Sequence, residues 1–322
     1  MQIKKGGIVS KLLADVPVPR MFRAEQIFPR EHIAPEQIPA LVEAELSKEP
    51  IRSKIKPGME IAITAGSRGI ANVAVITKSI VDFVRACGAH PFIVPAMGSH
   101  GGATAEGQLE VLADYGISPE SMGCEIRSGM EVVQLGISDT GLPVYLDKHA
   151  YQADGIIVSC RIKPHNSFRA RYESGICKMM AVGLGKQKGA EAVHSDGVER
   201  MGENILSIAK VILEKAPVLF AIPCIENAYD ETRLIEAIDR DDILAREPEL
   251  LKFAFSQMPS LLVGECDVLV VDEIGKNYSG SGVDPNITGT FSTNYAQGGV
   301  KVQRTCFLDL SEASHGNSLG EG

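Results

Sequence analysis

The residues best suited to chemistry are two histidines and a lysine within one polar stretch, residues 161–195. His165 and His194 belong to the residue type that transfers protons and binds metals near neutral pH. Lys178 lies among the apolar and small residues of 175–180. An amine in such surroundings loses part of its solvation, so it is more easily deprotonated and used as a nucleophile. Taken singly, each residue also fits a basic loop that leads into an ordinary helix rich in methionine and glycine.

Other candidate residues follow predicted strands in the same way. Four polar loops come directly after apolar runs, and together they hold Arg68, His100, His165, Lys178 and Lys276; the loops are 65–69, 97–103, 161–178 and 273–282. In a parallel α/β sheet, ligand-binding loops gather at the carboxyl ends of the strands. The convergence predicts one site at this edge, and it carries more weight than any single residue.

The loop around His100 is flanked by glycines and runs into a predicted helix start. Free N–H groups at a helix start favour a phosphate or a carboxylate. The pattern is neither a P-loop nor a GxGxxG fingerprint, so it does not indicate a nucleotide site of either kind. Arg68 could hold a carboxylate through two hydrogen bonds, and Lys276 is a weaker candidate for a second contact. Each of these residues could equally lie in a surface turn.

The histidines allow two kinds of chemistry. Two of them on opposite faces of a substrate could act as base and acid. Three of them, His100, His165 and His194, could instead bind a metal through neutral nitrogens. Their spacing is too wide for a compact zinc motif, so the sequence leaves both uses open.

The elements that must position these residues alternate between strand and helix. Strands are predicted at 59–64, 91–95, 155–160, 218–222 and 266–272, and hairpin strands at 131–135 and 142–146. Helices are predicted at 35–48, 72–87, 104–115, 201–216, 234–246 and 248–257. Strand, glycine turn and helix repeated in this order indicate an α/β fold with a mostly parallel sheet flanked by helices.

Two domains are expected in a chain of 322 residues. We place an N-terminal cofactor-binding and catalytic α/β domain at 1–258 and the start of a second α/β domain at 259–322, with the active site in the cleft between them. About sixty residues are few for an independent core, so the second domain is predicted to be incomplete and the chain to be a piece of a longer protein.

The composition limits the class of partner. The net charge of −9 gives no support for nucleic acid or an anionic membrane, and no apolar run reaches the roughly 20 residues that span a bilayer. The seven cysteines lack CxxC spacing, which is typical of reduced thiols in a cytoplasmic protein. A small molecule is the expected ligand, and the oligomeric state is left open.

With these motifs assembled, the chain resembles the lactate racemase family, whose members depend on a nickel-pincer nucleotide. The resemblance extends from the strand at 59 onward. It is carried by Ser99-His100-Gly101, by Pro164-His165, and by Lys178 in Ser-Gly-Ile-Cys-Lys, which His194 follows sixteen residues later. This last spacing is the most specific element.

The resemblance implies a role for each residue. Lys178 is expected to anchor the cofactor covalently and His194 to ligate nickel. His100 and His165 would be the acid/base pair, Arg68 would orient the substrate, and Lys276 would be a weaker second contact. The implied activity is that of an isomerase, a racemase or epimerase that inverts the α-carbon of a 2-hydroxy acid by reversible hydride transfer.

Several departures from the family pattern concern the substrate more than the cofactor. Ala65 stands where the family has an aspartate. The segment between His165 and Lys178 is longer and carries extra charge at Arg169, Arg171 and Glu173, which suggests a substrate larger or more polar than lactate. Two alternatives are a family member that binds cofactor or ligand without turnover, and a three-histidine metal hydrolase.

Overall fold

The fold is organised around one six-stranded sheet. The computed structural model describes residues 7–17, 20–67 and 69–318. Within those ranges, no helix combines the length and the apolar character needed to span a membrane.

The strands are β1 (Glu60–Ala65), β2 (His90–Pro95), β3 (Val132–Ile137), β4 (Pro143–Asp147), β5 (Gly155–Arg161), β6 (Val218–Glu226), β7 (Thr232–Ile235), β8 (Ile238–Asp239), β9 (Glu265–Ile274) and β10 (Lys301–Leu310). The helices are α1 (Ile8–Leu12), α2 (Ile38–Leu46), α3 (Val73–Ala86), α4 (Ala105–Asp114), α5 (Pro119–Met122), α6 (Lys148–Gln152), α7 (Ile176–Lys178), α8 (Lys186–His194), α9 (Met201–Lys215), α10 (Ile243–Gln257) and α11 (Pro285–Thr288). A π-helix, Met179–Leu184, joins α7 to the segment before α8.

The order of the main sheet is β2-β1-β5-β6-β7, and β8 pairs with β6. The pairs β1–β2, β1–β5 and β5–β6 are parallel, whereas β7 and β8 run antiparallel to β6. The predicted fold class, a mostly parallel sheet flanked by helices, is therefore confirmed. Three neighbouring parallel strands end at one edge, so the loops that follow β1, β2 and β5 are brought together.

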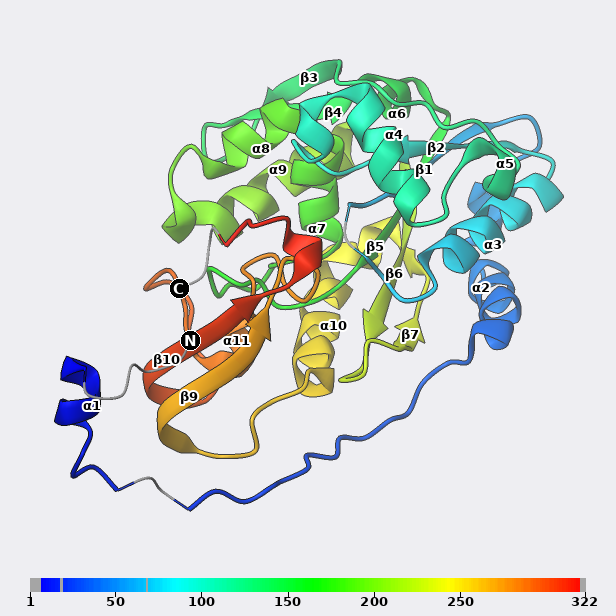
Figure 1. The fold of residues 1–322 in the computed structure, drawn as a ribbon. Coiled ribbons are helices and arrows are strands. Elements are labelled where there is room, and N and C mark those ends of the chain that lie inside the picture. Colours follow the sequence, from blue (N-terminus) through cyan, green and yellow to red (C-terminus); the bar gives the residue numbers. More distant parts are fainter. Residues whose placement is uncertain (1–6, 18–19, 68, 319–322) are drawn as a thin grey trace.

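Both faces of this sheet are buried, which explains why its strands read as continuous apolar runs. Ile61 and Ile63 face one core cluster with α2 and α3, while Ala62 faces the other with α8 and α9. Successive residues of a strand point to opposite faces, so each layer of helices covers alternate positions. Figure 1 shows α8 and α9 on one side of the sheet and α2 and α3 on the other.

A separate two-stranded sheet pairs β9 and β10 in parallel. The sequence predicted most of β9 but not β10. The predicted boundary at 258–259 falls between α10 and β9, and the division into two domains stays a prediction. The loops of this unit contact the stretch after β5, because Asn166 Nδ2 donates to Ser279 Oγ at 2.9 Å and to Ser281 Oγ at 2.8 Å.

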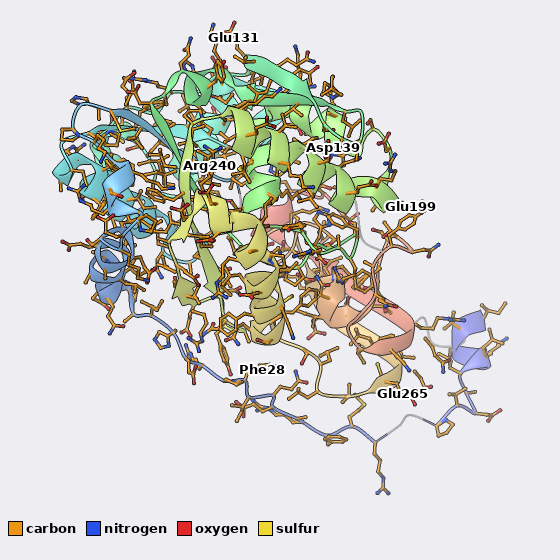
Figure 2. All side chains as sticks on the ribbon, turned by 180° about the vertical axis from the view of Figure 1, so that it is seen from behind. Phe28, Glu131, Asp139, Glu199, Arg240 and Glu265 are labelled. Carbon is orange, nitrogen blue, oxygen red and sulfur yellow. The ribbon has the colours of Figure 1, made fainter. Side chains whose placement is uncertain are left out.

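An extended N-terminal segment connects the main sheet to this second unit. Ile33 N donates to Thr232 O at 2.7 Å, and Phe28 packs edge-on against Tyr229. Farther along, the Gln26 side chain bonds Ser260 O and Leu262 N. Figure 2 shows Phe28 on this segment and Glu265 at the start of β9, both along the lower margin of the view.

The predicted helix at 234–246 is wrong in its first half. The end of β7 and the whole of β8 lie there, and a 3-10 helix, Arg240–Asp242, leads into α10 at Ile243. Ile235 and Ile238 are buried because β7 and β8 pair with the long strand β6. Pairing with an available strand edge outweighs a weak helical pattern. The predicted helix at 248–257 is the later part of α10, which runs through Pro248.

Helix α10 accommodates Pro248 because the central stretch supplies a substitute hydrogen bond. A proline inside a helix cannot donate to the carbonyl four residues earlier, which here belongs to Leu244. The Tyr172 hydroxyl donates to Leu244 O at 2.7 Å. A group that the helix leaves unpaired is thereby satisfied from the segment that leads to Lys178.

Helix α10 also holds the start of α7 through a buried carboxyl group. Glu247 Oε2 accepts from Cys177 N at 2.9 Å, one of the N–H groups that a helix start leaves unpaired. A Cβ at Gly175 would lie 2.3 Å from Glu247 Oε1, so the close approach requires glycine. Burial raises the pKa of Glu247 to about 7, against the lowering effect of its hydrogen bonds to Cys177 and Ile176.

Tyr172→Phe is expected to lower the free energy of unfolding by about 1–2 kcal/mol, because it leaves the Leu244 carbonyl unpaired. In a Pro248→Ala background the new N–H of residue 248 can bond that carbonyl, so the same substitution should cost less. Urea denaturation of the two single variants and the double variant measures the difference. If Tyr172→Phe lowered the free energy of unfolding equally in both backgrounds, the Tyr172 hydroxyl would not be replacing the backbone hydrogen bond that Pro248 cannot make.

The carboxyl of Glu247 should make stability depend on pH. Its folded-state pKa lies above its ordinary value, so the folded protein binds this proton more tightly than the unfolded chain. The free energy of unfolding should therefore fall as pH rises from about 4.5 to about 7. The full difference between the two pKa values corresponds to a decrease on the order of 3 kcal/mol. Glu247→Gln stays neutral, and its profile should lack this decline. Parallel profiles of the two proteins in urea denaturation from pH 4.5 to 8 would refute this.

Candidate active site

The loops after β1, β2 and β5 meet around the π-helix. Gly98 N donates to Gly183 O at 3.2 Å, which ties the loop after β2 to the π-helix. A Cβ at Gly66 would lie 3.1 Å from Met179 Cε, so the loop after β1 packs against the same helix. Single π-helical turns within α-helices are frequent at functional sites. The predicted convergence of these loops is thus a feature of the structure, while the roles of their residues stay predictions.

His100 lies on an exposed turn, and the residue after it packs closely against the backbone of α4. Gly101 has a φ of 66°, and a Cβ there would lie 2.6 Å from the Gly107 carbonyl carbon. Glycine is therefore required at this position. Thr104 caps α4 by accepting from Gly107 N at 3.0 Å, so the helix start expected after this loop is present.

Ser67 positions the ring of His100 and was missed by the sequence analysis. Its hydroxyl lies 2.5 Å from His100 Nδ1, and its carbonyl accepts from the Tyr115 hydroxyl at 3.1 Å. A hydroxyl can both donate and accept. Ser67 therefore supports His100 with either ring nitrogen protonated. Its place beside Arg68 in a loop after a strand was the available signal.

His165 is held as a neutral ring with a defined tautomer. Ser167 N donates to His165 Nδ1 at 3.1 Å. A backbone N–H can only donate, so Nδ1 carries the lone pair and the neutral ring bears its hydrogen on Nε2. Burial, followed by the positive charge of Lys178, lowers the pKa of His165 to about 2. In this arrangement His165 presents a hydrogen-bond donor to any ligand at Nε2.

The charged residues between His165 and Lys178 bond mainly to groups of their own loop. Glu173 is buried and accepts from His165 N at 2.6 Å and from Ala170 N at 3.1 Å. Arg169 Nη1 donates to His165 O at 2.7 Å and to Glu173 Oε2 at 3.2 Å. Two of the three charges that suggested a larger or more polar substrate therefore fix the loop that holds His165.

Lys178 ends the short helix α7, where the π-helix begins, and is partly buried. His194 is the exposed last residue of α8. The charges of both residues lower the pKa of His165. The structure thus brings Lys178 and His194 within electrostatic range of one histidine, although sixteen residues separate them in the sequence.

His194 has the tautomer that a metal ligand needs. Its Nδ1 lies 2.6 Å from Ala190 O. A carbonyl can only accept, so Nδ1 carries a hydrogen, and in the neutral ring the lone pair is on Nε2. Within the described residues, no group of three or more His, Cys, Asp or Glu side chains could hold a metal ion. In this part of the chain His100, His165 and His194 are therefore not grouped as a three-histidine centre.

The two remaining candidates are less well defined. Arg68 lies outside the described residues. Lys276 is partly buried in the loop after β9, where its Nζ donates to Gly280 O at 3.1 Å and its backbone N donates to Ser314 Oγ at 2.8 Å. Its loop reaches the site through the contacts of Asn166 with Ser279 and Ser281.

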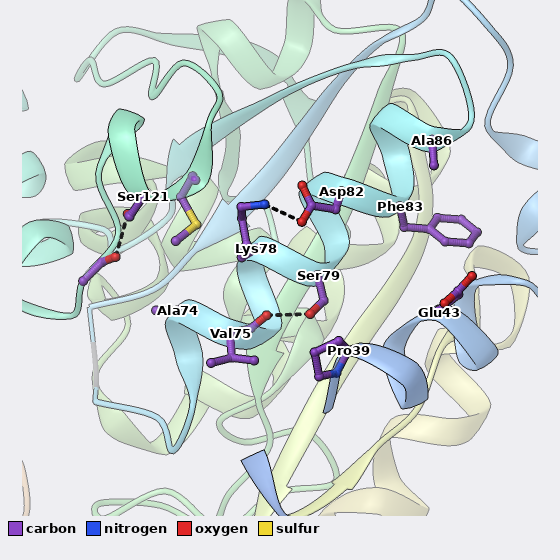
Figure 3. A pocket seen from close by; sticks show the side chains of 12 residues that line it. Pro39, Glu43, Ala74, Val75, Lys78, Ser79, Asp82, Phe83, Ala86 and Ser121 are labelled. Atoms are coloured by element: carbon purple, nitrogen blue, oxygen red, sulfur yellow. Dashed lines mark hydrogen bonds and ion pairs between the residues drawn. The ribbon is translucent and has the colours of Figure 1, made fainter. Parts of the chain in front are cut away.

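A surface hollow of about 550 Å³ lies between α2, α3 and α5. Figure 3 shows Lys78, Ser79 and Asp82 along its wall, with Lys78 paired to Asp82. None of its lining residues belongs to the four candidate loops. The hollow therefore has no part in the site described above.

Comparisons with known proteins agree with the fold. The structure is similar to the lactate racemase apoprotein from Thermoanaerobacterium thermosaccharolyticum, with a TM-score of 0.56 and 16% identity over 80% of this chain and 61% of that chain. A protein from Thermotoga maritima gives a TM-score of 0.58 and 14% identity over 78% of this chain and 66% of that chain. At such identities the likeness concerns the fold alone. The chain spans about three fifths of the length of the first of these structures.

No curated protein matches the sequence. The model of the lactate racemase N-terminal domain family, in contrast, matches residues 9–204. This match covers more than half of the 322 residues and includes the loops of His100, His165, Lys178 and His194. The chain therefore belongs to the lactate racemase N-terminal domain family.

Proposed function

We propose that this chain is an isomerase, a racemase or epimerase of 2-hydroxy acids, that uses a nickel-pincer nucleotide. In this proposal Lys178 anchors the cofactor covalently and His194 ligates nickel. The observation that carries the proposal is the tautomer of His194, whose Nδ1–H is used by Ala190 O. A single imidazole nitrogen near a partly buried lysine suits a metal that arrives with its other ligands already attached.

When bound, the cofactor supplies the hydride acceptor and donor that inversion of an α-carbon requires. The chain supplies binding and proton transfer. We assign Arg68 to the substrate carboxylate and Lys276 to a weaker second contact, because a guanidinium can hold a carboxylate through two hydrogen bonds. His100 and His165 are the proposed acid/base pair.

The two histidines are prepared differently for proton transfer. His100 can take up or release a proton at Nε2, because the Ser67 hydroxyl adapts to either form of Nδ1. His165 starts with a hydrogen on Nε2, so from this form it can donate a proton there. It can accept a proton at Nε2 only in the other tautomer, with the hydrogen on Nδ1, and that tautomer requires the Ser167 amide to turn away. Attachment of the cofactor as a thioamide would remove the charge of Lys178, one of the causes that lower the pKa of His165.

A family member without turnover is the second candidate. The observation in its favour is Ala65, which is 3% exposed at the end of β1, where the resemblance implies an aspartate. Ser67 offers the nearby polar contact to His100 instead.

We also propose a cytoplasmic location. All seven cysteines lie among the described residues and are free thiols, as expected in the cytoplasm.

Protein purified from cells that make the cofactor should carry a mass adduct and about one nickel per chain. Lys178→Ala should lose the adduct and the racemisation of 2-hydroxy acids. Lys188→Ala, an exposed lysine of the neighbouring α8, is the control and should keep both. Intact-mass spectrometry, metal analysis and chiral assays on aliphatic, aromatic, dicarboxylic and sugar-derived acids are the measurements. An unmodified wild-type protein without nickel would refute the proposal, whereas adduct and nickel without isomerisation would favour the second candidate.

Ser67→Ala should lower kcat about tenfold with little change in KM, since it removes one hydrogen bond that orients a proton-transfer residue. Ser67→Thr keeps the hydroxyl and should restore most of the rate. Steady-state racemisation over a range of pH is the measurement. If the alanine and threonine variants behaved alike, the hydroxyl would have no role in orienting His100.

A further inference from the structure

Lys186 is a fully buried lysine at the centre of the segment that carries Lys178 and His194. It lies eight residues after the first and eight before the second, at the start of α8, and its side chain is 0% exposed. Its φ is 54°, a left-handed conformation that a residue with a Cβ adopts at a cost. A helix can continue without a buried lysine and without a left-handed residue, so the contacts of Lys186 must account for both features.

The ammonium group of Lys186 has two hydrogen-bond acceptors and one carboxylate partner. Its Nζ donates to Pro95 O at 2.5 Å and to Gln108 Oε1 at 3.1 Å, and lies 3.3 Å from Asp147 Oδ2. Asp147 is also fully buried, and its Oδ1 caps α6 by accepting from Ala150 N at 2.9 Å. The cation is therefore neutralised by one carboxylate and joined directly to the end of β2.

Gln108 carries this connection into the His100 loop. Its Nε2 donates to Gly98 O at 3.0 Å and to His100 O at 3.2 Å, so both amide hydrogens have acceptors. Its Oε1 faces the ammonium group of Lys186. The opposite orientation of the amide would direct its NH₂ group at the cation and its oxygen at two carbonyls. Lys186 and the two carbonyls thus favour the same orientation of Gln108.

We propose that Lys186 is a positioning residue that holds the His100 loop in register with the Lys178–His194 segment. The catalytic part of this inference rests on the proposed function, while the structural coupling does not. The route runs from Lys186 through Gln108 to the carbonyls of Gly98 and His100. Neither Lys186 nor Gln108 is assigned a contact with the substrate. A charge pair needed for stability alone could be replaced by apolar side chains, whereas this pair orients an amide that serves a second loop.

Gln108→Met tests the coupling most directly, because it removes the relay and keeps the pair of Lys186 with Asp147. Lys186→Met removes the cation, and Lys186→Met combined with Asp147→Asn avoids leaving a buried carboxylate unpaired. Lys188→Met is the matched control: it makes the same substitution two residues later on the exposed side of α8.

Amide hydrogen exchange in the protein without cofactor is the first measurement. The amides of His100, Ala103 and Thr104, which bond Met97 O, Ser99 O and Gly101 O, should exchange at least about tenfold faster in Gln108→Met and in the double variant. Lys188→Met should match the wild type. Unchanged exchange at these amides in Gln108→Met would overturn the inference, whether or not Lys186→Met folds.

The second measurement uses the loaded enzyme. Gln108→Met should lower kcat at least about tenfold, keep KM within about twofold and keep the Lys178 adduct. An unchanged kcat in Gln108→Met would overturn the positioning role. A wild-type protein without adduct or racemisation would instead refute the proposed function, and the exchange experiment would still decide whether Lys186 holds the loop.

Discussion

The chain between Lys178 and His194, which we propose to serve one site, does not form one continuous α-helix. Sixteen residues of continuous α-helix would extend about 24 Å, which is too far for one bound molecule to reach both ends easily. The chain instead passes from α7 into the π-helix and then through Lys186, where φ is 54°. Such a conformation persists only where the surroundings determine it, and the acceptors around the ammonium group of Lys186 provide that environment.

The rest of the site depends on how the sheet presents its loops to this interrupted helix. Three parallel strands end together, and the loops that follow them reach the π-helix through backbone atoms and glycines. From the other side, α10 supplies Glu247 to the start of α7 and receives Tyr172 at the carbonyl of Leu244. Polar groups that the helix ends and the proline would leave unpaired are satisfied across the elements. These bonds fix the position of α7, the helix that ends at Lys178.

Periodicity in the sequence predicted the parts of the fold that bury apolar side chains on both sides. Ile61 and Ile63 alternate with Ala62 between the two cores, so their strand was evident from residue types alone. The segment at 234–246 was misread because its strands are short and form only by pairing with β6. Strand β10 was not predicted, although Val302, Cys306, Leu308 and Leu310 alternate with mostly polar residues. Arg304 and Phe307 break the alternation, and much of the strand is exposed. Ser67 and Lys186 were missed because their roles depend on partners 33 and 91 residues away.

The N-terminal segment has a mechanical consequence for the small sheet of β9 and β10. Gln26 grips the connection between α10 and β9 at two points, Ser260 O and Leu262 N, while Ile33 is bonded to the rim of the main sheet at Thr232. The connection is therefore held by the N-terminal segment as well as by its own two ends. A rotation of the small sheet about residues 258–264 must either break the Gln26 hydrogen bonds or move the N-terminal segment with it. The travel available to the loop of Lys276 is set in part by residues 26–33, which lie outside every predicted site.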